Sequence, residues 1–76
     1  MQEEKLLGRI VIDPKVMTGK PIIKGTRLTV QHILGLLAQG MEIKDVLQEY
    51  TGLTKEDIFA CFMFAQQTLE NTAFAL

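Results

Sequence analysis

The feature that most constrains this chain is a series of three apolar stripes at helical spacing, which begins after residue 28. Side chains that recur three and four residues apart line one face of an α-helix. Gly40 ends the first stripe and Gly52 the second, and glycine is common just beyond a helix C-terminus. The first two stripes consist of Val30, Ile33, Leu34 and Leu37, and of Ile43, Val46, Leu47 and Tyr50. The pattern predicts three helices.

Capping residues indicate where these helices begin. Thr29 is a suitable N-cap for the first helix, and Thr54 for the third, with Asp57 at the position that completes a capping box. Apolar residues flank both caps at the spacing of a hydrophobic staple, Leu28 with Ile33 and Leu53 with Ile58. Good helix formers continue the third helix through about Leu69.

The first third of the chain is predicted to be extended. Arg9–Ile12 is rich in β-branched residues and is stopped by Asp13-Pro14, and Pro21–Ile23 is a second short β-like run. Thr18–Lys20 between them has turn chemistry. We therefore expect one domain over residues 1–76: an extended β ribbon at 1–28, a three-helix bundle at 29–70 and a frayed tail at 71–76. The fold class is mainly α, with two short strands before a three-helix bundle that contains a helix-turn-helix.

The connection around Gly52 matches the tight turn of a helix-turn-helix. A chain of 76 residues buries only a small core, so a disulfide, a metal or a partner subunit usually adds stability. Cys61 is the only cysteine and His32 the only histidine, which argues against a disulfide within the chain and against a zinc site. We expect a homodimer.

Charge is distributed unevenly along the chain. Residues 1–27 hold six basic and three acidic side chains, whereas residues 28–76 hold two basic and six acidic ones. Attraction for nucleic acid must therefore come mainly from the N-terminal third.

The most distinctive local feature is the hexapeptide Ile22–Arg27. Gly25 permits a positive φ, and the flanking basic side chains are placed to contact phosphates just before a helix N-terminus. The alternative is a tight strand-to-helix turn with two solvated bases, and both interpretations can hold together. A phosphate loop is excluded, because Pro14 and Pro21 stand where that motif needs glycine and Ser or Thr. The candidate DNA-contacting residues are Lys20, Lys24, Gly25, Thr26, Arg27 and Lys55.

The third predicted helix is apolar around its whole circumference from Phe59 to Ala65. One face suits the internal core, for which we assign Ile58, Cys61, Phe62 and Ala65. The opposite face then needs a partner, unless the core is unusually apolar. The candidate dimer contacts are Phe59, Phe62, Met63 and Phe64. As a recognition helix it is poorly equipped, because it opens Lys55-Glu56-Asp57 and offers only Lys55, Gln66 and Gln67 as base readers.

No catalytic set is recognisable, so we expect a non-enzymatic protein without a metal or cofactor. His32 has no nucleophile or carboxylate beside it in sequence, and Cys61 fits an inert packed thiol. The unpaired cysteine, the polar start of the chain and the lack of a membrane-length apolar run predict a cytoplasmic protein without membrane contact.

The motifs together resemble the domain of unknown function 433 family. The resemblance runs over roughly residues 8–66 and is most specific in Gly19–Val30, after Ile12–Pro14. Further matches are Ile33-Leu34, Leu37-Ala38, Gly40, Glu49-Tyr50, Leu53-Thr54 and Glu56–Ile58. Thr18, Glu42 and Thr51 depart from the family pattern, standing where glycine, serine and proline are common.

That family is similar to VapB-type antitoxins, which implies a three-helix homeodomain-like fold with N-terminal strands. The resemblance also implies a small dimeric DNA-binding protein, an antitoxin or autoregulator that binds its own operator and a cognate toxin. The alternative is a protein-interaction module that masks a toxin without contacting DNA. An enzyme is the least favoured of the three classes.

Overall fold

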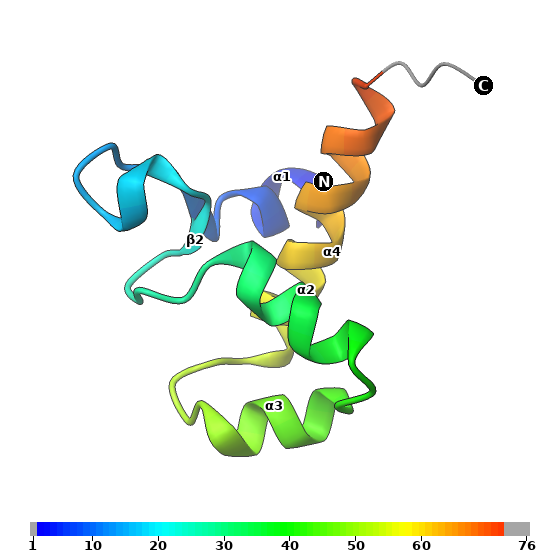
Figure 1. Ribbon diagram of the computed structural model, residues 1–76. Coiled ribbons are helices and arrows are strands. Elements are labelled where there is room, and N and C mark those ends of the chain that lie inside the picture. Colours follow the sequence, from blue (N-terminus) through cyan, green and yellow to red (C-terminus); the bar gives the residue numbers. More distant parts are fainter. Residues whose placement is uncertain (1, 73–76) are drawn as a thin grey trace.

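The computed structural model describes residues 2–72, which form four α-helices and one small hairpin (Figure 1). The elements are α1 (Gln2–Leu7), β1 (Ile10–Val11), a 3₁₀ turn η1 (Met17–Gly19), β2 (Ile22–Ile23), α2 (Val30–Ala38), α3 (Ile43–Glu49) and α4 (Lys55–Glu70). Of the expected tail, Asn71 caps α4 and residues 73–76 lie outside the described part of the chain.

The three helices predicted after residue 28 are confirmed as α2, α3 and α4. The Thr29 side chain accepts a hydrogen bond from the His32 amide over 2.9 Å, as expected of an N-cap. Thr54 and Asp57 form the predicted capping box at the start of α4. Gly40, with a φ of 103°, allows the chain to leave α2 in a left-handed conformation.

The two predicted strands pair as an antiparallel hairpin. Ile10 lies opposite Ile23 and Val11 opposite Ile22. A two-residue ladder is too small to stand alone, but both isoleucines of β2 are buried against the helices. The hairpin is therefore held by its packing on the bundle.

The expectation of an extended segment throughout residues 1–28 is wrong at Gln2–Leu7, which form α1. A six-residue helix is unstable by itself, so its stability must come from tertiary contact. α1 lies against α4, where Leu6 and Leu7 are half-buried and the Gln67 side chain donates to Glu3 over 3.3 Å (Figure 1). Two leucines in a short polar segment give too weak a pattern to predict this helix.

The core lies where β2 and the three predicted helices meet. Its fully or nearly buried members are Ile23, Val30, Ile33, Val46, Leu53, Ile58 and Cys61. The sequence assignment to the core was correct for Ile58 and Cys61, but wrong for Phe62, which is 43% exposed. Ala60 is fully buried instead, because α4 turns this small residue inward.

Asp57 links the N-terminal hairpin to the start of α4. Its Oδ1 lies 3.1 Å from Nη1 of Arg9, at the start of the hairpin. Its Oδ2 accepts hydrogen bonds from the amide and the hydroxyl of Thr54 over 2.9 and 3.2 Å. One buried carboxylate thus caps α4 and attaches the N-terminal hairpin to it.

We predict that Asp57→Ala lowers the free energy of unfolding by about 2 kcal/mol, because the cap and a charge-assisted hydrogen bond are lost together. The ion pair itself adds little to this figure, since the Arg9 side chain is 42% exposed. Urea unfolding followed by circular dichroism measures the change. The neighbouring exposed Glu56 is the matched control, and Glu56→Ala should change stability by less than about 0.5 kcal/mol. Equal effects of the two variants would contradict the role given to Asp57.

Candidate nucleic-acid interface

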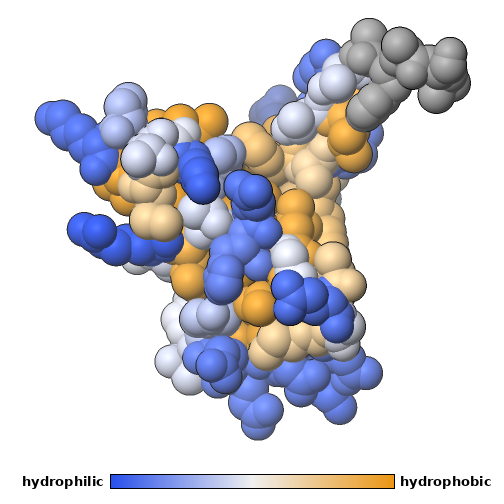
Figure 2. All heavy atoms as spheres, in the orientation of Figure 1, coloured by the Kyte–Doolittle hydropathy of each residue, from blue (hydrophilic) through white to orange (hydrophobic). Residues whose placement is uncertain are grey.

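Most exposed basic side chains project from one part of the molecule, residues 12–28, which we call the basic lobe. It contains Lys15, Lys20, Lys24 and Arg27, all exposed, against the single acid Asp13. In Figure 1 it lies on the left, away from α3, and Figure 2 shows hydrophilic side chains extending from that side. The ion pairs within residues 2–72 are Arg9–Asp57 and Lys44–Glu42, so the four cations of the lobe have no described carboxylate partner.

The turn at Ile22–Arg27 is built by the Thr26 hydroxyl. This hydroxyl donates to the Ile23 carbonyl over 2.7 Å and accepts from the Leu28 amide over 3.0 Å. Gly25 has the positive φ that the sequence predicted, 81°. The structural interpretation of the hexapeptide therefore holds, and Thr26 is occupied within the turn. Lys24 and Arg27 stay exposed on either side of it.

The 3₁₀ turn before Lys20 is conformationally strained. Met17, Thr18 and Gly19 have φ values of 50°, 54° and 79°, so three consecutive residues are left-handed. Such a conformation costs roughly 1–2 kcal/mol for each residue that carries a Cβ. Thr18 thus occupies a backbone position that favours glycine, the residue common there in the family that the sequence resembles.

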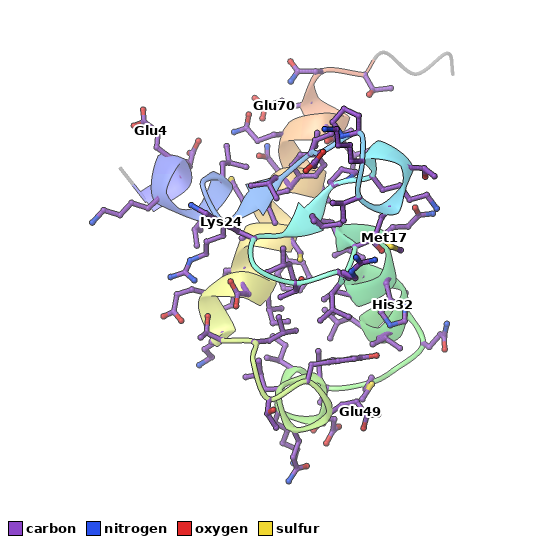
Figure 3. The ribbon with its side chains drawn as sticks, turned by 90° about the vertical axis from the view of Figure 1, so that its left-hand side faces the viewer. Glu4, Met17, Lys24, His32, Glu49 and Glu70 are labelled. Atoms are coloured by element: carbon purple, nitrogen blue, oxygen red, sulfur yellow. The ribbon has the colours of Figure 1, made fainter. Side chains whose placement is uncertain are left out.

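Lys24 also borders a shallow depression of about 520 Å³ between α1, the hairpin and the start of α4. Its lining is of mixed charge: Glu4, Lys5, Gly8, Arg9, Lys24 and Asp57. Figure 3 shows Lys24 and Glu4 at this side of the molecule. Because Arg9 is already paired with Asp57, the depression adds Lys5 to the positive surface but does not form an enclosed anion site.

Lys55 belongs to another surface. It opens α4 and is followed at once by Glu56 and Asp57. The outward side of α4 carries Phe59 and Phe62, which are 41% and 43% exposed. Of the two glutamines proposed as base readers, Gln66 is exposed and Gln67 is half-buried. An outward side with these residues matches a protein interface better than a major-groove reader.

The four residues assigned to a dimer contact lie on different sides of α4. Phe59 and Phe62 are exposed, whereas Met63 and Phe64 are half-buried, with Phe64 packed against the core. Phe64 also lines an apolar groove of about 330 Å³ between α2 and the second half of α4. The other groove residues are Pro21, Val30, Gln31, Leu34, Ala65, Thr68 and Leu69.

The side chains of His32 and Cys61, the two residues most often used in catalysis, have packing roles in this structure. His32 on α2 lies with Nε2 3.0 Å from the Tyr50 hydroxyl, and the two rings meet edge to face. Burial, and to a lesser extent the Asp57 carboxylate, raises the pKa of the Cys61 thiol from 9.0 to about 11. Its thiolate, the reactive form, is therefore scarce at neutral pH.

Two further findings concern the described residues. No three His, Cys, Asp or Glu side chains in this part of the chain are grouped so as to hold a metal ion. No helix there has both the length and the apolar character needed to cross a membrane.

Comparison with known proteins identifies the family. The model of DUF433, proteins of unknown function, matches residues 10–65. The chain belongs to the DUF433 family. The match covers the hairpin, the basic lobe and α2 to the middle of α4, but leaves out α1.

Two relatives share part of this chain. The crystal structure of a DUF433 member from Anabaena variabilis is similar to it with a TM-score of 0.79 and 34% identity, over 88% of this chain and 66% of that one. An uncharacterised protein of Archaeoglobus fulgidus is 68% identical over 24 residues, which are 32% of this chain and 67% of that protein. The chain thus spans slightly less than two thirds of the solved relative.

We predict that Gly25→Ala lowers the free energy of unfolding by roughly 1–2 kcal/mol. The added Cβ meets no atom within 4 Å, so the cost comes from the backbone conformation alone. Gly52→Ala is the control, because that Cβ also meets nothing and φ is not left-handed. Its stability should be unchanged or slightly raised. Thermal unfolding distinguishes the two variants. An unaffected Gly25→Ala protein would contradict the left-handed backbone conformation of Gly25.

Proposed function

We propose that this DUF433 protein is a small DNA-binding regulator of the antitoxin type, which holds DNA phosphates with the basic lobe. The observation that carries the proposal is the presence of four exposed cations on the lobe without a described carboxylate partner. Lysine and arginine side chains in this state can replace the counterions of a duplex. The resemblance of the sequence motifs to VapB-type antitoxins favours the same role.

The charge distribution favours one orientation on DNA. The lobe has one acid among its charged residues, whereas α3 and the residues beside it carry Glu42, Asp45 and Glu49 against Lys44. The molecule measures 38 × 30 × 28 Å, and the lobe and α3 lie at different ends of it (Figure 1). At physiological salt, charges more than about 8 Å apart are largely screened. The acidic end therefore does not cancel the attraction of the lobe.

In this proposal DNA contact is mainly with the backbone. The turn presents Lys24 and Arg27 beside the start of α2, whose first turn carries no acidic residue. The start of α4, in contrast, has an acidic first turn. Backbone contacts position a protein on a duplex without specifying its sequence. We therefore expect salt-sensitive binding with modest sequence preference.

We predict that the protein retards the DNA upstream of its own gene in gel shifts at low salt. Lys24→Ala combined with Arg27→Ala should weaken binding and reduce the slope of log affinity against log salt by about 1.8, or about 0.9 per lost phosphate contact. Lys44→Ala is the matched control, since Lys44 is an exposed lysine at the acidic end and pairs with Glu42. No retardation at low salt, or equal effects of the lobe and control variants, would refute the proposal.

A second candidate is a protein that masks a basic partner without contacting DNA. The exposed acids Glu42, Glu49 and Glu56 favour it, because a basic nuclease would be attracted to them. We predict that Glu49→Lys with Glu56→Lys then prevents co-purification with the product of the adjacent gene. The Lys24→Ala, Arg27→Ala protein should still bind that partner. The opposite pattern would favour a partner site on the lobe.

A further inference from the structure

We propose that the outward face of α4 binds a second copy of this chain, with the two α4 helices antiparallel. The surface consists of the α4 stripe, defined as Phe59, Phe62, Gln66 and Leu69, together with the adjoining 330 Å³ groove. This inference does not depend on DNA binding, and the two can fail separately.

Helix geometry explains why the stripe faces outward. At about 100° per residue, the four stripe positions fall within an arc of about 80°. The buried positions Asp57, Ala60 and Cys61 point about 100–160° away from Phe59, whereas the buried Ile58 borders the stripe. α1 and α2 pack against the other sides of α4, as the Gln67–Glu3 contact and the groove show. Three large apolar side chains in the stripe are 41–57% exposed.

A dimer contact through α4 needs the groove as well as the outward face of the helix. α4 has 16 residues, so its outward face is about 24 Å long and about 10 Å wide, or roughly 240 Å². A stable interface takes about 800 Å² from each partner, so the helix face alone supplies roughly a third of it and the contact must extend onto neighbouring surface. The groove extends the apolar surface from Leu69 across to Leu34 and Pro21. Its lining is almost wholly apolar, and its size suits an inserted phenylalanine side chain.

The stripe is complementary to itself when the helices are antiparallel. A two-fold axis at the level of Phe64 places Phe59 beside Leu69 of the second copy, and Phe62 beside its Gln66. Phe62 then lies next to the part of the groove formed by Ala65 and Leu69 in that copy. Such isologous contacts close after two subunits and leave no apolar face open.

The charges at the two ends of α4 favour the same orientation. Lys55 stands at its first residue and Glu70 at its last, and both are exposed. An antiparallel pair brings the lysine of one copy near the glutamate of the other, whereas a parallel pair places like charges together. Like-charge juxtaposition opposes association, so the parallel pair is disfavoured.

Sedimentation analysis of the whole chain tests the association. We expect a dimer for the wild type, and for Phe62→Glu a rise in the dissociation constant of at least about 30-fold, as for a central interface residue. Leu69→Lys should act in the same direction. The control is Ile12→Glu, because Ile12 is 60% exposed but lies on the basic lobe. A monomeric wild type, or a dimer that tolerates both stripe variants, would overturn the proposal.

Pulsed electron paramagnetic resonance tests the orientation. In a Glu56→Cys protein carrying nitroxide labels, which keeps Lys55 and Glu70, an antiparallel pair separates the labelled positions by about 24 Å along the helix axis. A parallel pair would bring them to about 10 Å, the distance between packed helices. Cys61 should stay unlabelled at neutral pH, because it is fully buried. A distance near 10 Å between the labels would refute the antiparallel pairing. So would binding of the product of the adjacent gene to the stripe in place of a second copy.

Discussion

The Asp57 carboxylate is the contact on which the arrangement of the molecule depends. It satisfies the first turn of α4 and at the same time pairs with Arg9, 48 residues earlier in the chain. The hairpin is also attached by the apolar packing of β2 and by backbone hydrogen bonds to the start of α2, such as that from the Val30 amide to the Pro21 carbonyl over 3.0 Å. Because β2 lies within the basic lobe, the Asp57–Arg9 contact adds a directional polar link to the apolar packing that positions the lobe on the bundle. A capping residue therefore contributes to the position of a charged surface.

The same contact limits what α4 can do. A recognition helix needs its first turns free to enter a groove, but here Asp57 is buried and Glu56 is exposed beside it. One turn further, the exposed side carries two phenylalanines. Helical spacing alone suggested base reading, whereas the charge and burial of these positions favour protein contact.

Capping and periodicity were enough to predict the helices that have their own start signals. Thr29 and Thr54 cap α2 and α4 through local hydrogen bonds that depend on neighbouring residues only. α1 has no such signal, because its stability comes from α4, about 50 residues away in sequence. Phe62 was misassigned to the core for a related reason. In a helix that is apolar all round, the choice of the buried side depends on where α1 and α2 pack.

In the candidate site, too, features set by neighbouring residues were predictable and features set by distant residues were not. Gly25 has the left-handed φ that its turn indicated, and the exposed bases beside it follow from local sequence. The groove was not predictable, since Pro21, Leu34 and Leu69 come together only in the folded chain. The charged and the apolar surface thus lie mostly on different elements, and they meet at Pro21, which lines the groove from within the basic lobe. A dimer through α4 carries two basic lobes, which would double the number of cations on a duplex that both lobes reach. Since the salt slope of binding grows with the number of phosphate contacts, association would strengthen DNA binding without any new contact within the chain.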